Sequence, residues 1–247
     1  MTALALAIAF AASAPETLPL TEPGAVLRAS NDAFLAGNRA AAAAGYRRLR
    51  DAGFTSTDLQ YNLGLAELAL GHRGLAVLAF ERALKLDPLD DDARKNLALA
   101  RAANVDQVVG GEPEPLWERA SERVPLDPTA AVALGAWLAA FALVLAGRLR
   151  SSLRRRIALP AVLLFAVALL SGAALAAGAW VLDASGRSVV VADAAKVHEG
   201  PSDSFKSTFE VHEGLTVRVV DREGRFVRIR LPNGLEGWLD EGAVAAI

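Results

Sequence analysis

The chain has 247 residues, enough for two small domains, and 53% of them are hydrophobic, a share raised by alanine and by two long apolar runs. Its formal net charge of −2 gives no indication of nucleic-acid binding. It contains no cysteine, which excludes disulfide bonds, thiol redox chemistry, a cysteine peptidase mechanism and a thiolate metal site.

Residues 1–14 (MTALALAIAFAASA) have the form of an export signal. Their apolar core ends in Ala12-Ser13-Ala14, an A-x-A cleavage pattern. The core is too short to span a membrane, so a removed signal peptide is favoured over a third anchor. Two features weaken this prediction: no basic residue precedes the core, and Pro15 would follow the cut.

Residues 61–88 predict a helix, a short turn and a second helix. Apolar residues recur at helical spacing, Gly71 interrupts the pattern, and Asp87-Pro88 ends it. Small residues stand where the two helices must approach each other closely: Gly64, Ala76 and Ala83.

A shift of 34 residues relates this segment to the one before it. The shift places Gly37 under Gly71 and Tyr46 under Phe80. The pattern resembles the tetratricopeptide family, most strongly in the central unit. The resemblance implies an all-α tetratricopeptide solenoid of two and a half or three helical hairpins over residues 23–105.

Tetratricopeptide solenoids present a concave groove lined by the first helix of each unit. The resemblance implies a protein- or peptide-binding groove, with a pure spacer as the alternative. Glu67 departs from the family, which prefers a large apolar residue there, and Leu68 beside it is the candidate to fill that place. The side chains expected to face the groove are Tyr61, Asn62, Leu65, Leu68 and Asn96.

Residues 106–128 are rich in Gly, Pro and charge, which is typical of a linker. Within them LWERASERV is compatible with two helical turns on a membrane surface, where Trp117 would suit the headgroup zone. A plain linker with an exposed Trp is the equal alternative.

Two runs without ionisable residues follow, at 129–147 and 157–182. As helices at about 1.5 Å per residue, both can cross a hydrocarbon core of about 30 Å. We therefore predict a two-helix transmembrane hairpin.

The connection 148–156 between these runs contains five arginines and no acid. Short Arg-rich loops stay cytoplasmic, so both flanking parts should lie on the other side. The sequence predicts a two-pass protein of the inner (cytoplasmic) membrane with both soluble parts in the periplasm. The arginines that would determine this topology are Arg148, Arg150, Arg154, Arg155 and Arg156.

Residues 188–247 alternate apolar and polar side chains in short runs separated by turn residues. Leu215 to Val219 and Phe226 to Leu231 have the period of strands, and Asn233-Gly234 is a strong signal for a tight turn. We expect five or six strands in a small closed barrel.

Three landmarks in this segment resemble the bacterial SH3 family: Gly200-Pro201-Ser202, His212-Glu213-Gly214 and Gly237-Trp238. The resemblance implies an all-β SH3-like barrel and ligands such as cell-wall peptides. His198 stands where the family usually has Arg, which puts wall binding in doubt. Phe205 and Trp238 are the candidate ligand contacts, although a core position is favoured for Trp238.

Residues suited to catalysis or metal binding are sparse. The three histidines, His72, His198 and His212, have no second ligand at metal spacing, and no phosphate-binding loop or catalytic triad is found. We therefore expect no enzyme activity, no cofactor and no metal.

The order of parts resembles the BatE-type proteins of aerotolerance (Bat) operons. That resemblance implies an envelope scaffold linked to oxidative or envelope stress. Its partners would be membrane proteins with von Willebrand factor A domains and a MoxR-type ATPase. The alternative is a wall-targeted protein whose SH3 domain binds peptidoglycan while its repeats recruit a wall enzyme.

Overall fold

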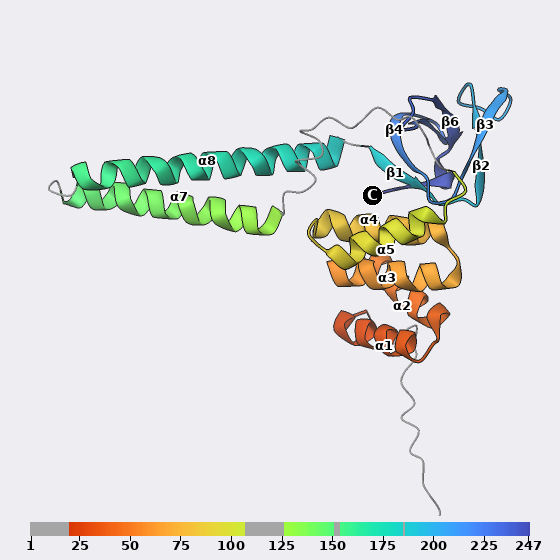
Figure 1. Cartoon of the computed structure of the whole chain (residues 1–247), viewed down its shortest axis with the longest axis horizontal. Coiled ribbons are helices and arrows are strands. Elements are labelled where there is room, and N and C mark those ends of the chain that lie inside the picture. The colour runs from red at the N-terminus through yellow and green to blue at the C-terminus, as the bar shows by residue number, and fades with distance from the viewer. Residues whose placement is uncertain (1–19, 107–125, 151–153, 185) are drawn as a thin grey trace, which may run out of the picture.

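The computed structural model describes residues 20–106, 126–150, 154–184 and 186–247. Figure 1 shows a stack of short helices, a pair of long helices projecting away from it, and a β domain (residues 186–247) lying on the stack. The predicted signal peptide (1–14) lies outside the described residues, as does most of the predicted linker (106–128).

The helical stack comprises α1 to α5 and repeats every 34 residues. Counting from their first residues, α3 follows α1, α4 follows α2 and α5 follows α3 at this interval. The predicted helix, turn, helix over residues 61–88 is confirmed. The bounds are α1 Pro23–Leu35, α2 Arg39–Asp51, α3 Thr57–Leu70, α4 Arg73–Leu86 and α5 Asp91–Ala102.

Local signals set the helix ends. The Ser56 side chain accepts a hydrogen bond of 3.1 Å from the main-chain N–H of Leu59 and so caps the start of α3. Gly71 ends α3 at φ 85°, in the left-handed region that glycine adopts without strain. Asp87 follows α4 with an extended backbone, and Pro88 prevents the helix from continuing.

Small residues allow α3 and α4 to pack closely. A Cβ atom on Gly64 would lie 2.6 Å from the ring of Phe80, which is fully buried. Ala76 and Ala83, also predicted at helix crossings, are fully buried as well. Tyr46 lies 34 residues before Phe80 and is buried in the same way, so equivalent aromatic side chains fill the core of successive units.

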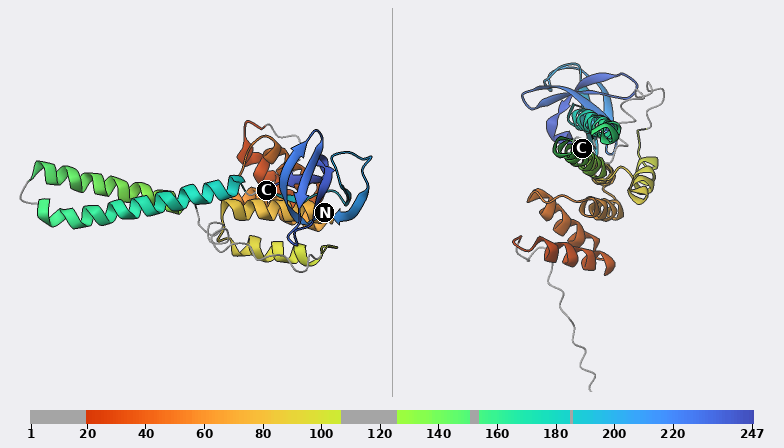
Figure 2. Two further views of the ribbon diagram at one scale, coloured as in Figure 1. Left: turned by 90° about the horizontal axis from the view of Figure 1, so that it is seen from above. Right: turned by 90° about the vertical axis from the view of Figure 1, so that its left-hand side faces the viewer.

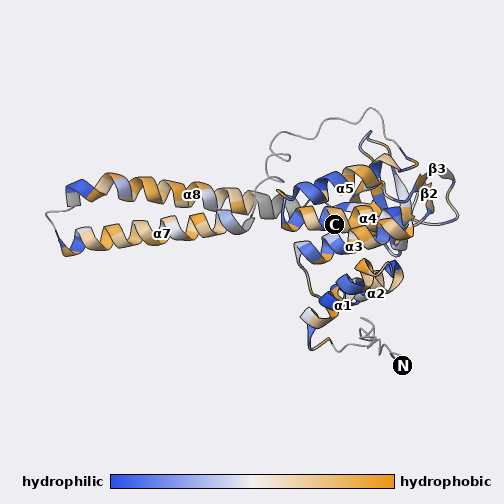
Figure 3. Cartoon of the chain, turned by 60° about the horizontal axis from the view of Figure 1, so that its bottom comes forward, coloured by the Kyte–Doolittle hydropathy of each residue, from blue (hydrophilic) through white to orange (hydrophobic). Residues whose placement is uncertain are grey.

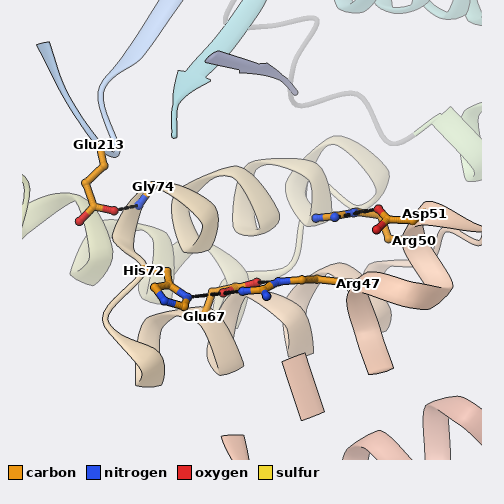
Figure 4. Close-up of polar contacts among 7 residues, drawn as sticks. All are labelled: Arg47, Arg50, Asp51, Glu67, His72, Gly74 and Glu213. Carbon is orange, nitrogen blue, oxygen red and sulfur yellow. Dashed lines mark hydrogen bonds and ion pairs between the residues drawn. The ribbon is translucent and has the colours of Figure 1, made fainter. Parts of the chain in front are cut away.

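Buried carboxylates join successive units of the stack (Figure 4). Glu67 is fully buried and accepts two hydrogen bonds of 2.5 Å from Arg47, with His72 Nδ1 2.9 Å away. Glu81 pairs with Arg101 in the same way. In the 34-residue repeat Arg47 corresponds to Glu81. Glu67 likewise corresponds to Arg101. The same ion pair therefore occurs twice, with its charges exchanged.

The long helices are α7 (Leu126–Leu149) and α8 (Arg154–Ala184), and they pack side by side (Figures 1 and 2). Both are long and apolar enough to cross a membrane. Their surface is largely hydrophobic (Figure 3), and Leu134, Phe141 and Leu170 expose 60 to 72% of their area. Such a continuous apolar surface is unfavourable in water.

The predicted basic loop 148–156 is shorter in the structure than expected. Arg148 belongs to the last turn of α7, and Arg154, Arg155 and Arg156 form the first turn of α8. Arginine is a good helix former, so nothing in these side chains stops the helix at the edge of the apolar run. Residues 151–153 lie outside the described residues.

The β domain is one antiparallel sheet of seven strands, one or two more than predicted. The strand order is β3-β2-β6-β5-β4-β1-β7. The bounds are β1 Arg187–Val190, β2 Ala194–His198, β3 Ser207–His212, β4 Thr216–Glu223, β5 Phe226–Arg230, β6 Glu236–Asp240 and β7 Val244–Ala246. The sheet surrounds an apolar core that includes Val197, Val211, Ile229 and Leu239.

The sheet is not closed by hydrogen bonds, in contrast to the predicted closed barrel, because β3 and β7 are edges. The helical stack covers both edges instead. Arg82 donates to the main-chain oxygen of Ala246 in β7 (2.5 Å), and the His212 N–H in β3 donates to Asp106 (2.6 Å). Unpaired edge groups are thus satisfied within the same chain.

The β domain packs directly on α4 and α5 through an apolar cluster. Val189 of β1 is fully buried against Val77, Phe80 and Leu97 of the stack, while its neighbour Val190 points into the β core. Because the last unit of the stack has only α5, the β domain covers the end of the stack (Figure 1). The two soluble parts therefore form one packed unit.

Close backbone approach and hydrogen bonds fix this packing. A Cβ on Gly74 of α4 would lie 2.8 Å from the main-chain oxygen of Val190, and its N–H donates to Glu213 (2.9 Å, Figure 4). Asn104 donates to the main-chain oxygen of Gly214 (2.9 Å), which has φ 85° and leaves no space for a Cβ.

Candidate functional site

The first helices of the units, α1, α3 and α5, share one side of the stack, which we call the α1–α3–α5 face. Asn62 Nδ2 on α3 donates to Asn31 Oδ1 on α1 (3.3 Å), which also accepts from the Tyr46 hydroxyl (2.7 Å). On the next unit, Asn96 Nδ2 of α5 donates to the Tyr61 hydroxyl of α3 (3.2 Å). Three of the predicted groove residues, Tyr61, Asn62 and Asn96, thus lie on this face, each half-buried.

Leu65 and Leu68 are packed more deeply than a groove position requires. Both are partly buried against the apolar cluster that the stack forms with the β domain. The repeat equivalent of Leu65 is Leu99, which is 63% exposed and lies one turn from Asn96 on α5. The sequence analysis missed Leu99, although a further 34-residue shift from Leu65 would have found it.

Burial keeps the two tyrosines of this face neutral. It raises the pKa of Tyr46 to about 12. The pKa of Tyr61 is raised by burial and, to a smaller extent, by the carboxylates of Asp92 and Asp90. Both hydroxyls therefore act as neutral hydrogen-bonding groups at ordinary pH.

A second candidate surface crosses the β domain. Trp238 of β6 is the register partner of His198 in β2 and of Arg228 in β5. Cross-strand partners point to the same side of a sheet, so these side chains share one face. The guanidinium carbon of Arg228 lies 5.8 Å from the centre of the Trp238 ring, within cation–π range.

Trp238 is not part of the β core, in contrast to the position that the sequence analysis favoured for it. Its neighbours Gly237 and Leu239 are buried, whereas Trp238 is half-buried on the opposite side of the strand. The alternation of a strand therefore places it outward. Arg228, which covers the Trp238 ring, was not predicted.

Phe205 lies in the β2–β3 connection and is 47% exposed. A Cβ on Gly200 would lie 2.8 Å from its ring, so the ring rests on the glycine backbone. The main-chain oxygen of Phe205 lies 2.9 Å from His198 Nδ1, and its N–H donates to Ser202. His198 thus holds this connection beside Trp238.

Each histidine has a local partner. His72 contacts Glu67, His198 contacts the Phe205 carbonyl, and His212 contacts Asp106 at 3.0 Å. Within the described ranges, no three His, Asp or Glu side chains are grouped so that they could hold a metal ion. The chemistry of both faces is that of hydrogen bonding and aromatic contact.

Comparison with known proteins locates one family in the chain. Neither the curated proteins nor the solved structures contain a match. The family model that matches, bacterial SH3 domain, covers residues 193–245, which hold β2 to β6 and most of β7. The strand β1, which carries Val189 to the helical stack, precedes the matched segment. Residues 193–245 are therefore a bacterial SH3 domain, extended at its start by the strand that packs on the helices.

Proposed function

We propose that this protein is a non-enzymatic, membrane-anchored adaptor whose α1–α3–α5 face binds a protein partner. The observation that carries the proposal is the pairing of amide and tyrosine side chains on that face with the exposed Leu99. Amides suit the main chain of a bound segment, and an exposed leucine beside them supplies apolar contact area.

We further propose that the stack is a tetratricopeptide solenoid. The 34-residue interval between helix starts, the glycine after α3 and the small residues at the α3–α4 crossing support this assignment. The SH3 domain would then complete the solenoid by covering its last helix, so that the two parts present their faces as one rigid unit.

The membrane placement is likewise a proposal: α7 and α8 cross the inner membrane as a hairpin, with the arginines between them in the cytoplasm. The stack precedes α7 and the β domain follows α8, yet the two are in contact. A chain that crosses twice returns to its starting side, so the contact supports a common periplasmic location.

The absence of native cysteine makes this topology testable by single-cysteine labelling. With a membrane-impermeant maleimide applied to cells whose outer membrane is permeabilised, Asp92→Cys and Ser204→Cys should react, because both positions are exposed on the soluble unit. Ser151→Cys, in the basic connection, should react only after the inner membrane is disrupted. The reverse pattern would show the inverted orientation.

Binding by the α1–α3–α5 face is tested with Leu99→Glu. Leu99 is exposed, so the fold should tolerate glutamate, while the apolar contact with a partner is replaced by a charge. We expect loss of the partners that crosslinking and co-purification from membranes recover with the unchanged chain. The matched control is Leu89→Glu, because Leu89 is 61% exposed but lies in the α4–α5 connection.

A second candidate function is attachment to peptidoglycan through the SH3 domain, favoured by the exposed Phe205 ring and the outward Trp238. Leu99→Glu distinguishes the two. If it retains every partner, and purified peptidoglycan retains the full chain but not a Phe205→Ala, Trp238→Ala variant, the wall function takes precedence.

We propose as partners the classes that the resemblance to BatE-type proteins implies. These are membrane proteins with von Willebrand factor A domains and a MoxR-type ATPase system, in an envelope complex linked to oxidative stress. A rigid soluble unit on a membrane hairpin suits such a role, because it holds a docking face at a fixed height above the bilayer.

A further inference from the structure

A pocket of about 230 Å³ lies between the end of α2, the α2–α3 connection and the second half of α4. This volume corresponds to about eight waters at roughly 30 Å³ each, which suits a small ligand. None of its residues belongs to the α1–α3–α5 face. Its lining combines cations, one amide and apolar side chains: Arg50, Arg82, Lys85, Gln60, Phe54 and Leu86.

The basic side chains have hydrogen-bond donors to spare. Arg82 donates through Nε (3.2 Å) and Nη2 (2.5 Å) to the main-chain oxygen of Ala246, and Lys85 donates to that of Ile247 (2.9 Å). A guanidinium carries five N–H groups and an ammonium three, so each side chain retains at least two further donors. The existing bonds hold both cations in place beside the pocket.

Positive charge at the pocket exceeds the carboxylates that balance it. Arg50 pairs with Asp51 at 2.7 Å. Asp51 is the only carboxylate side chain of the described residues in an ion pair with any of the three cations. Burial and, after it, the charge of Arg50 lower the pKa of Arg82. Both effects disfavour its charged form, and a bound anion would offset both.

Gln60 adds a second requirement. It is 3% exposed, and its Oε1 has no hydrogen-bond donor among the described residues. A buried acceptor without a donor is costly, and a ligand hydroxyl would satisfy it. The ligand that fits therefore carries both an anionic group and a hydroxyl.

We propose that this pocket binds a small phosphate ester with a free hydroxyl group, of the glycerol phosphate class. A phosphate offers at least three oxygens to the three cations, whereas a carboxylate offers two. The hydroxyl is placed to donate to Gln60, and Phe54 and Leu86 provide an apolar wall for the carbon chain.

The ligand has two possible sources, a free phosphate ester or the headgroup of an anionic phospholipid. The α4–α5 end of the stack, where the pocket lies, is on the side from which α7 and α8 project (Figures 1 and 2). Asp87, Asp90 and Asp91 at this end disfavour general attraction to an anionic bilayer, so recognition would depend on the pocket itself.

The test is a calorimetric titration of the full chain in neutral detergent with glycerol 3-phosphate, with sodium sulfate and glycerol as comparison ligands. We expect glycerol 3-phosphate to bind more tightly than sulfate, and glycerol not to bind. Chain reconstituted in nanodiscs distinguishes the sources. If phosphatidylglycerol discs, but not phosphatidylcholine discs, block the titration, the headgroup occupies the pocket; if neither blocks it, the free ester is the ligand.

Variants make the assignment specific to these residues. Arg50→Gln with Lys85→Gln should weaken glycerol 3-phosphate binding about tenfold or more, since two charge-assisted contacts are removed. Gln60→Leu should weaken glycerol 3-phosphate but not sulfate, and the exposed Arg94→Gln should change neither. Circular dichroism checks that each variant is folded. Unchanged binding in the double variant, or no binding by the original chain in detergent or in either disc, overturns the proposal.

Discussion

Replacing Arg47 by methionine is expected to destabilise the helical stack by about 3 kcal/mol, because it leaves the buried Glu67 carboxylate without its two hydrogen bonds. This is the lower end of the usual range, since Arg47 is partly exposed and His72 remains beside the carboxylate. The measurement is amide hydrogen exchange of the full chain in detergent. Protection in α3 should fall by about two orders of magnitude.

The double variant Arg47→Met, Glu67→Met is the control for this interpretation. With both charges removed, apolar packing replaces the ion pair, and stability should return to within about 1 kcal/mol of the original chain. If the double variant is as unstable as the single one, the loss comes from packing of the Arg47 stem, and the ion pair contributes little.

Val189→Asp is expected to separate the β domain from the helical stack. It places an unpaired carboxylate in the apolar cluster with Val77 and Phe80, at a cost of about 3 kcal/mol or more. Exchange in α5 and in residues 103–106 should rise strongly, because these segments are covered by the β domain. Ala194→Asp is the matched control, since Ala194 is exposed on β2.

Gly74→Val tests the same contact from the helical side. Its side chain would meet the main-chain oxygen of Val190 within about 3 Å, so the domains must move apart. Both variants should therefore give the same exchange pattern in α5. If α5 keeps its protection in both, the β domain does not stabilise the end of the stack.

The helices of the stack could be predicted because their signals are local. Gly71, Pro88 and the helical spacing of apolar residues act within a few positions of one another. The contact between stack and β domain could not be predicted in this way. Val189 has the same alternation whether its outer side meets water or a helix, and Glu213 meets Gly74 across 139 positions of sequence.

The candidate faces were predicted in part for the same reason. Tyr61, Asn62 and Asn96 were found because they repeat with the helical unit. The outward position of Trp238 was open to prediction from its buried neighbours in an alternating strand. The pairing of Glu67 with Arg47 was not, because a carboxylate inside a helical repeat gives no signal of which distant side chain satisfies it.

The dependence of the last helix on the β domain also sets an order of events in biosynthesis. The stack ends near Asp106, and the strand that covers it begins at Arg187. About 80 residues separate them, so at 5 to 20 residues per second the ribosome needs several seconds more to deliver the missing half. During that interval Val77, Phe80 and Leu97 lack their final cover. A chain interrupted after the second long helix would keep this apolar end open, and quality-control proteases could recognise it as unfinished.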